Sequence, residues 1–374
     1  MKLSTQTLRD SILRDYLETG NFPVGARLPT VKKLAARYRV SCPTVGKAIA
    51  LLAAEGWLGK RRGSGIYVAS LPDRTKASRF RRQRRIGCIV QSLRAILAQR
   101  VFEGVEQTAR KHNCVVEVAS SNWDAIEEKR LVDAMRQRGI QGIVLYPTTH
   151  RHREHEYLAR EFRDYPIVVV DLYQPTMRRP HLIFDNWSAG REMTRHLLEQ
   201  GRREIAFLKF SDDVPYRSVD DRVAGYRRAL EDAGLPFVAD RLIAFEGRGP
   251  LARDHREALE RFLALNPRPT ALITPYDPYA RASIAWLRQR GVAAPEEVLV
   301  AGFDNLQDEP WEERFPTTQP DFVRMGERAT ELLLERMESR DFAPTGLILP
   351  CPLVSAGGEG VSKREEPTKR SNPI

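Results

Sequence analysis

Short apolar runs alternate with helical patterns over most of the chain, and this alternation predicts the architecture. Nine short apolar runs have the length and composition of buried strands. They lie at residues 86–90, 115–119, 143–146, 167–170, 182–184, 205–208, 242–245, 271–274 and 298–301. Amphipathic helical patterns separate most of them, at 101–112, 189–200, 223–233, 256–265 and 280–290. Strands that alternate with helices form parallel sheets covered by helices, and nine strands suit two lobes better than one sheet.

The first 69 residues carry a different pattern, which predicts three helices and a hairpin. Apolar positions share one face over residues 5–19, and a second helix is expected after Thr30. After a tight turn, Ser41 is a good N-cap for a third helix over 42–55. Two short strands with a glycine-containing turn between them are expected at 57–60 and 66–68. This order of elements is that of a winged helix-turn-helix, in which the helix after the turn enters the major groove of DNA. The whole chain is therefore predicted to be an α/β protein with a winged helix-turn-helix before its two-lobed domain of parallel sheets.

The positive charge is concentrated in the same front segment. Residues 1–85 contain 19 Lys and Arg against 5 Asp and Glu, whereas the whole chain of 374 residues has a formal net charge of +11. The rest of the chain is therefore slightly acidic. Duplex DNA attracts a basic module because binding releases counterions from its phosphates. We therefore predict that the front segment binds DNA.

Composition also indicates where the domains end. Residues 70–85 lack periodicity and are crowded with arginine, as is typical of a linker. The last residues, 357–374, are polar and aperiodic and are expected to form a disordered tail. The predicted organisation is a DNA-binding domain over 1–69, a basic linker over 70–85, an effector-binding domain over 86–356, and the tail.

Several classes of protein do not fit this sequence. It has neither an apolar stretch of about 20 residues, which a membrane helix needs, nor a signal peptide, so we expect a cytoplasmic protein with no membrane partner. No GxSxG, HExxH or P-loop motif occurs, and we predict no enzyme, no catalytic residue and no cofactor. Four widely spaced cysteines form no CxxC pair, which argues against a zinc ribbon or a disulfide framework. These cysteines are Cys42, Cys88, Cys114 and Cys351.

A local histidine cluster leaves two interpretations open. His150, His152 and His155 lie within seven residues of one another, which could suit a metal ion. The alternative is a solvated polar loop. We favour the loop and predict no metal site.

The front segment resembles the GntR family of bacterial regulators over about residues 4–69. The resemblance rests on many fixed spacings, carried by residues 25–30, 34–35, 40–41, 44–45, 48–49, 52, 55–58 and 63–68. Where that family presents arginines on its recognition helix, this chain has Cys42 and Gly46, and each lost arginine–guanine contact removes about 1–3 kcal/mol of base discrimination. The outward positions and the resemblance together suggest six DNA contacts, at Lys32, Ser41, Thr44, Lys47, Arg62 and Gly63.

Polar residues follow the carboxyl ends of several strands in the large module. Asp171, Asp185, Asp277 and Asp304 all stand at such ends. Ligands of open parallel sheets bind beyond these ends, where carboxylates can accept hydrogen bonds from a polyhydroxylated ligand. The alternative for any single aspartate is that it caps the next helix.

This module resembles the LacI/GalR sensor domain, which is itself similar to periplasmic sugar-binding proteins, over about residues 85–356. The resemblance rests on residues 102–105, 139–144, 185–186, 196–206, 222–226, 269–271, 300–305 and 317–318. It implies a two-lobed periplasmic-binding-protein-like fold with parallel sheets. It also implies that Arg222, Asp277 and Asp304 contact the effector, and Asp185 joins them as a strand-end candidate. An arginine fork with two carboxylates suits sugar hydroxyls or a purine-like edge.

A GntR-like head joined to a LacI-like sensor predicts a transcriptional regulator, and most simply a repressor. We expect a small-molecule effector, a sugar or similar polar metabolite, to bind between the lobes and change the affinity for operator DNA. A homodimer is expected because paired heads read two half-sites. The alternative is a cytoplasmic small-molecule-binding protein with only non-specific DNA affinity.

Overall fold

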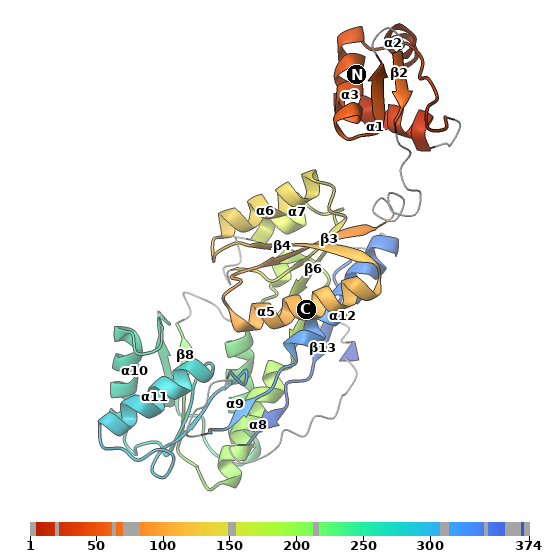
Figure 1. The fold of residues 1–374 in the computed structure, drawn as a ribbon. Coiled ribbons are helices and arrows are strands. Elements are labelled where there is room, and N and C mark those ends of the chain that lie inside the picture. Colours follow the sequence, from red (N-terminus) through yellow and green to blue (C-terminus); the bar gives the residue numbers. More distant parts are fainter. Residues whose placement is uncertain are drawn as a thin grey trace. The chain divides into compact units, whose positions relative to one another are not determined.

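In a computed structural model of the chain, the described residues form two compact units, one up to Gln83 and one from Arg84 (Figure 1). The first unit is called the head below, and the second is called the sensor. The structure describes residues 5–18, 22–61, 65–69, 83–148, 155–211, 217–247, 249–306, 314–339, 343–355 and 368–369.

The head contains three helices and a small sheet. Its elements are α1 (Thr5–Ile12), a π-helical continuation η1 (Leu13–Glu18), α2 (Val31–Tyr38), α3 (Cys42–Ala54), β1 (Leu58–Arg61) and β2 (Gly65–Val68). Thr30 caps α2 by accepting a hydrogen bond from the backbone N–H of Lys33. The turn that follows has Arg39 in the left-handed region, with φ 52°, and this reverses the chain before α3. One cluster of fourteen buried apolar side chains, with Leu8, Leu34 and Ile49 among them, holds the helices together.

The wing of the head has three strand-like segments rather than two. β1 and β2 pair antiparallel, with Leu58 opposite Val68. The segment before α2 pairs with the other edge of β2, because the N–H of Leu28 donates to the carbonyl of Ile66 and the N–H of Val68 donates to the carbonyl of Ala26. The predicted winged helix-turn-helix is therefore confirmed, and its sheet is larger than the hairpin that the sequence indicated.

The sensor is built from two parallel sheets, each in its own lobe. The first sheet has the strand order β15-β13-β7-β6-β5-β3-β4 and the second has the order β11-β10-β8-β9, and every pairing is parallel except that of β15. The strands are β3 (Arg84–Val90), β4 (Cys114–Ser120), β5 (Gly142–Leu145), β6 (Ile167–Val170), β7 (His181–Phe184), β8 (Ile205–Phe210), β9 (Leu242–Phe245), β10 (Ala271–Ile273), β11 (Leu299–Ala301), β12 (Thr317–Thr318), β13 (Gly346–Leu349), β14 (Leu353–Val354) and β15 (Thr368–Lys369).

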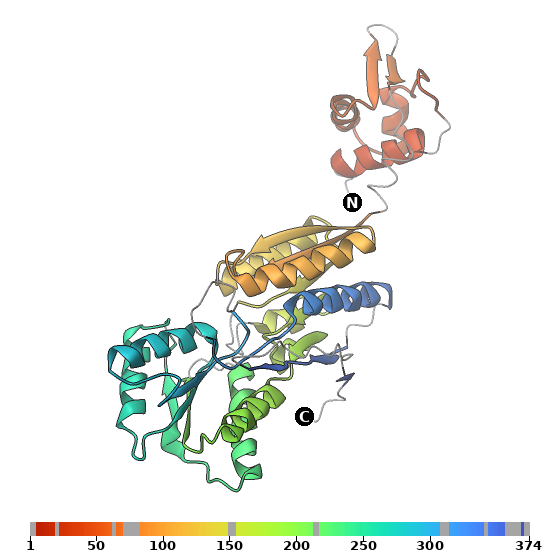
Figure 2. The same ribbon diagram turned by 60° about the horizontal axis from the view of Figure 1, so that its bottom comes forward.

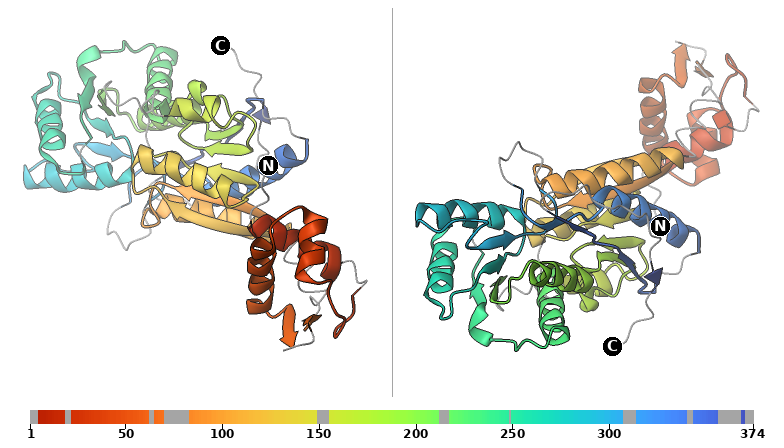
Figure 3. Two further views of the ribbon diagram at one scale, coloured as in Figure 1. Left: turned by 90° about the horizontal axis from the view of Figure 1, so that it is seen from above. Right: turned by 90° about the horizontal axis from the view of Figure 1, so that it is seen from below.

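Helices cover both sheets of the sensor, and Figure 3 shows the two lobes as separate groups of elements. The helices are α5 (Ile96–Lys111), α6 (Ala125–Gln137), α7 (Glu156–Arg160), α8 (Asn186–Glu199), α9 (Arg217–Asp232), α10 (Arg253–Ala264), α11 (Asp277–Gln289) and α12 (Phe322–Ser339), with the 3₁₀ turns η3 (Pro175–Met177) and η4 (Ala239–Arg241). No helix in the described part of the chain is long and apolar enough to cross a membrane.

The chain passes between the lobes more than once, so each lobe contains segments that are distant in sequence. It leaves the first lobe after β7, and it returns through β12 before α12, which packs beside α5 (Figure 2). β12 and β14 pair antiparallel and contact α8. The segments that join the two lobes are also hydrogen-bonded to one another. The N–H of Asp185 donates to the carbonyl of Leu349, and the N–H of Gln319 donates to the carbonyl of Pro352.

Two glycines allow α5 and α12 to touch backbone to backbone. A Cβ on Gly104 would lie 1.9 Å from the carbonyl oxygen of Val323, and a Cβ on Gly326 would lie 2.0 Å from that of Val101. Larger residues at either position would force the helices apart. The close contact explains why a glycine interrupts the otherwise regular pattern of residues 102–105.

All nine predicted sensor strands are present, with ends shifted by at most two residues. Some boundaries differ from the prediction. β3 begins at Arg84, inside the predicted linker, because it pairs in parallel with β4 from that residue onward. Residues 368–369 of the predicted tail form β15, because β13 offers an open edge for pairing. The rest of the tail, and linker residues 70–82, lie outside the described residues.

Candidate DNA-binding and effector-binding sites

Four of the six predicted DNA contacts lie on α2, on α3 or at the N-cap of α3, on either side of the tight turn. Lys32 and Lys47 are exposed on these two helices, and Ser41 is exposed at the start of α3. Thr44 is half-buried, and its hydroxyl lies 2.7 Å from the hydroxyl of Ser41. Ser41 also accepts a hydrogen bond from the N–H of Thr44, so it caps α3 as expected. Arg62 and Gly63 lie outside the described residues.

The outer face of α3 carries small side chains at its two unusual positions. Cys42 is exposed at the first residue of the helix. A Cβ added to Gly46 would meet no other atom within 4 Å, so no contact inside the protein requires glycine there. The glycine therefore leaves open space on the outer surface of α3, and it lowers the stability of the helix.

In the sensor, Arg222 connects four segments at the boundary between the lobes. It lies on α9 and is 6% exposed. Its Nε donates to Oδ1 of Asn186 at 2.8 Å, Nη1 to the carbonyl of Pro275 at 2.7 Å, and Nη2 to Oδ1 of Asp304 at 3.0 Å. The guanidinium also lies over the ring of Phe303, 4.2 Å from its centroid. Each nitrogen of the fork thus has a fixed acceptor, which holds the group in one orientation.

Two glycines, one on α8 and one on α9, set the position of Arg222 by letting the two helices pack closely. A Cβ on Gly190 of α8 would lie 2.1 Å from the carbonyl oxygen of Arg222, and a Cβ on Gly225 of α9 would lie 2.1 Å from that of Trp187. The backbones of α8 and α9 therefore touch at the position of Arg222. This contact brings the first residue of α8, Asn186, within hydrogen-bond distance of the arginine.

The first lobe contributes Tyr146 and Asp171 to the same region. The Tyr146 hydroxyl donates to Oδ2 of Asp171 at 2.7 Å. Burial, with a smaller contribution from the Asp304 carboxylate, raises the pKa of Asp171 to about 6. Burial and the Asp171 charge likewise raise the pKa of Tyr146. Two carboxylates from different lobes and one guanidinium therefore act on one another across the boundary.

Asp277 and Asp185, also predicted to bind the effector, have other partners. Asp277 is fully buried, and it accepts hydrogen bonds from the Thr317 hydroxyl at 2.7 Å and the N–H of Leu306 at 2.8 Å. Burial is the main reason that the pKa of Asp277 rises to about 7. Asp185 caps α8 through the N–H and hydroxyl of Ser188. The structure brings Arg222 and Asp304 together, whereas these two aspartates secure the connections beside them.

A small cavity of about 10 Å³ lies next to this cluster and receives side chains from both lobes. Its lining residues are Asp171, Leu172, Tyr173, Gln174, Ile183, Asn186, Arg217, Ser218 and Asp221. Sequence reasoning placed Asp171 and Asn186 at strand ends but did not include them in the predicted site. Tyr146 was missed because it ends an apolar run and reads as a core residue. Arg217 and Asp221 were missed because only the packing of α9 brings them to the boundary.

Of the three clustered histidines, only His155 lies among the described residues. His155 is fully buried, with Nε2 3.1 Å from Oε1 of Glu128. The same carboxylate accepts hydrogen bonds from the Tyr157 hydroxyl and the N–H of Thr148. His150 and His152 lie outside the described residues. Within the residues that are described, no group of three or more metal-ligating side chains is present.

Comparison with known proteins agrees with the division of the chain into a DNA-binding head and a sensor. Residues 6–68 match the gntR family of bacterial regulatory proteins, and residues 194–356 match the periplasmic binding protein-like domain. The arabinose metabolism transcriptional repressor of Geobacillus stearothermophilus is 26% identical, over 92% of this chain and 94% of its own. The HTH-type transcriptional repressor PurR of Aliivibrio fischeri is 30% identical, over 69% of this chain and 76% of its own. The solved structure of transcription regulator CcpA of Lactococcus lactis has a TM-score of 0.64 at 20% identity, over 73% of this chain and 98% of its own.

Proposed function

The chain belongs to the bacterial transcriptional regulators that join a GntR-family DNA-binding head to a LacI-type sensor domain, and from this premise we propose a specific mechanism. The protein is a repressor that binds a specific operator in the cytoplasm as a homodimer. A sugar binds between the lobes of the sensor and changes the affinity of the heads for DNA. No catalytic step is involved.

One observation carries the effector proposal, namely the cluster of Arg222, Asp304 and Asp171 at the lobe boundary. Arg222 and Asp304 are held 3.0 Å apart in the second lobe, and Asp171 comes from the first. Sugar hydroxyls donate hydrogen bonds to carboxylates and accept them from a guanidinium, so this set can bind adjacent hydroxyls of one ring. The names of two relatives, both repressors of arabinose metabolism, support a sugar over other polar metabolites.

Ligand contacts in both lobes would couple sugar binding to DNA affinity. A ligand changes DNA affinity only to the extent that it prefers one arrangement of the lobes. A sugar that touches Asp171 on one side and Asp304 on the other stabilises a closed arrangement, because an open one breaks one set of contacts. A ligand held by a single lobe would have no such preference.

The proposed DNA contacts divide into two kinds. Lys32 and Lys47 are exposed cations suited to phosphates or guanine edges, and Ser41 and Thr44 present hydroxyls at the start of α3. Arg62 and Gly63 remain the proposed contacts of the wing. With Cys42 and Gly46 in place of arginines, backbone contacts take a larger share of the affinity, and we expect a strong salt dependence.

The homodimer is proposed on an exposed apolar surface at one edge of the first lobe. β4 is the edge strand of its sheet, with exposed Val115 and Val118. Trp123 is 61% exposed and Ile126 is 83% exposed just beyond it. Apolar side chains on an open edge favour association, and a second copy of the chain supplies the second head that two half-sites need.

The effector proposal is tested by thermal-shift screening with pentoses, hexoses and nucleobases, followed by titration of operator binding with each hit. We expect a sugar to raise the melting temperature and to change operator affinity at least tenfold. Arg222→Ala should abolish this response while DNA binding persists. Because Arg222 is buried, the nearly isosteric Asp304→Asn provides a second variant, and Arg253→Ala on the outside of α10 is the control.

Two results would contradict this proposal. If Asp304→Asn and the control respond equally to the sugar, the effector does not use the cluster. If the protein binds random and operator DNA equally, the alternative of a small-molecule-binding protein with non-specific DNA affinity replaces it.

A further inference from the structure

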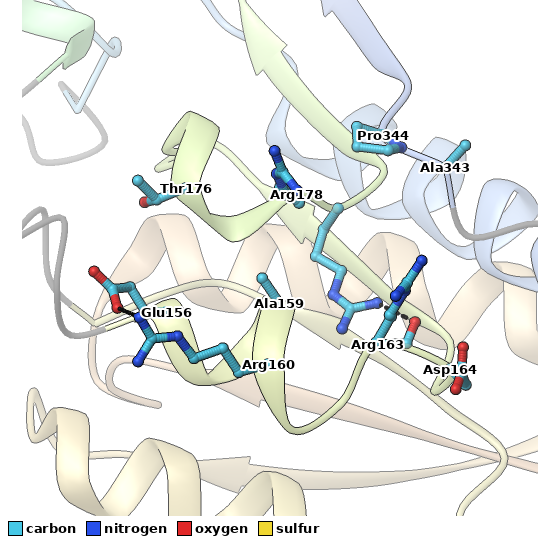
Figure 4. A pocket seen from close by; sticks show the side chains of 10 residues that line it. Glu156, Ala159, Arg160, Arg163, Asp164, Thr176, Arg178, Ala343 and Pro344 are labelled. Carbon is cyan, nitrogen blue, oxygen red and sulfur yellow. Dashed lines mark hydrogen bonds and ion pairs between the residues drawn. The ribbon is translucent and has the colours of Figure 1, made fainter.

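The first lobe contains a second, larger pocket at the amino ends of its strands, away from the cleft. The cleft residues Asp171 and Asp185 follow the carboxyl ends of β6 and β7. This pocket instead lies where the chain enters β6, β7 and β13, and its volume is about 960 Å³ (Figure 4). Its lining residues are Glu156, Ala159, Arg160, Arg163, Asp164, Thr176, Arg178, Arg179, Ala343 and Pro344. We call it the arginine pocket.

The lining carries an excess of positive charge. Four arginines face two acidic residues, and one acid is already used, because Glu156 pairs with Arg160 at 2.9 Å. Arg163 and Arg178 are exposed, and they line the pocket from two segments, the loop after α7 and the residue after η3 (Figure 4). Exposed guanidinium groups that line one cavity attract an anion.

The decisive residue is Arg179, which is 1% exposed in this pocket. Its Nη1 donates to the carbonyl of Arg163 at 3.0 Å and its Nη2 donates to the carbonyl of Leu158. Its Nε is buried with no hydrogen-bond partner among the described residues. Burial lowers the pKa of Arg179 to about 10, while the Asp164 charge acts in the opposite direction. A buried cation whose partners are carbonyls is costly, and a bound anion would offset that cost.

We propose that the arginine pocket binds a phosphorylated small molecule, at a site separate from the cleft and independent of the sugar proposed there. Guanidinium forks match the oxygen geometry of a phosphate monoester. The volume is far larger than an inorganic phosphate ion needs and lies within the range of about 300–1,000 Å³ typical of metabolite sites. The phosphate would lie near Arg163, Arg178 and Arg179, and the organic part would lie against Ala159 and Pro344.

Calorimetric titration at constant ionic strength tests this proposal with three probes: a hexose 6-phosphate, the same hexose without phosphate, and inorganic phosphate. We expect the hexose phosphate to bind the full-length protein. The double variant Arg163→Ala/Arg178→Ala should raise its Kd about tenfold or more, because two charge-assisted hydrogen-bonding groups are lost. Both residues are exposed, so this variant should fold normally. Arg253→Ala, which removes an exposed arginine of the second lobe, is the matched control.

The outcomes separate the ligand sources. Tighter binding of the hexose phosphate than of inorganic phosphate supports a phosphorylated metabolite, and equal binding of the two overturns the claim that the pocket reads an organic part. Binding of the unphosphorylated hexose with equal affinity would place the signal in the cleft and overturn the proposal. Hexose phosphate binding that is unchanged in the double variant would overturn it as well, whatever the cleft binds.

Discussion

Gly190 is the position where the structure makes its most direct prediction about the effector site. Replacing it with alanine adds a single methyl group at the point where α8 and α9 touch. That carbon would lie 2.1 Å from the carbonyl oxygen of Arg222 and 2.6 Å from its Cα, whereas real contacts of this kind are essentially never below 3.0 Å. The neighbouring atoms are backbone, so no side chain can rotate away. The helices must therefore move apart by roughly 1 Å.

The cost of this separation can be worked out in two parts. Overpacking of a tightly packed interface costs about 1–3 kcal/mol. Alanine recovers about 1 kcal/mol because it is the better helix former. We expect a net loss of about 1–2 kcal/mol at the upper end of the overpacking range. For a domain of this size each kcal/mol shifts the melting temperature by about 2–4 °C, so the sensor transition should fall by roughly 2–8 °C.

The same displacement moves the guanidinium of Arg222 away from Asn186 and Asp304. Gly190→Ala should therefore also weaken binding of the sugar found in the screen, as measured by titration calorimetry. Gly46→Ala is the matched control, since its Cβ meets no atom within 4 Å and it lies in the head. An unchanged sensor transition together with unchanged sugar affinity in Gly190→Ala would refute the account of how Arg222 is positioned.

Three further predictions concern DNA binding and pH. Gly46→Ala should raise the free energy of unfolding of the head by about 1 kcal/mol yet weaken operator binding in a fluorescence-anisotropy titration; unchanged binding would show that the glycine does not serve close approach to DNA. Lys32→Ala should weaken operator binding and reduce the slope of log K against log salt by about 1, with sugar affinity unaltered. Asp171 has a pKa of about 6 in the folded protein against an ordinary 3.8, so the folded state binds more protons between these values and its free energy of unfolding falls as pH rises through them. Sugar affinity should rise over the same window because the ionised carboxylate is the better acceptor, and Asp171→Asn should reduce both trends. The fall in the free energy of unfolding that remains would be due to Asp277, whose pKa is about 7.

The strands of the sensor could be predicted because parallel strands are covered on both faces. Residues 167–170 form a continuous apolar run, and all four are buried in β6. α6 and β13 were not predicted from the sequence. α6 carries a buried Glu128 on the face where an apolar residue is expected, because that carboxylate is paired with His155 and Tyr157. β13 is as long as β6, and its pairing with β7 identifies it as a strand.

The candidate effector site was predictable in part, because two of its residues stand in recognisable motifs. Arg222 and Asp304 stand in motifs that resemble known sensors, and the structure brings them together. Asn186 accepts from Arg222, and Tyr146 donates to Asp171. Their positions depend on how α8 crosses α9 and how the two lobes meet, which no local pattern encodes. Asp277 was predicted from the same resemblance and stays a predicted contact, and its burial and its bond to Thr317 could not be predicted from the sequence.

The hydrogen bonds among the segments that join the lobes limit how the sensor can move. β12 is paired with β14, and the N–H of Asp185 donates to the carbonyl of Leu349. The segments that join the lobes therefore form one hydrogen-bonded unit rather than independent connections. Sliding one lobe past the other would break several of these bonds at once, whereas a rotation about the connecting segments bends them only slightly. These bonds therefore favour rotation of one lobe relative to the other over sliding, and a ligand that contacts both lobes would act mainly on that rotation.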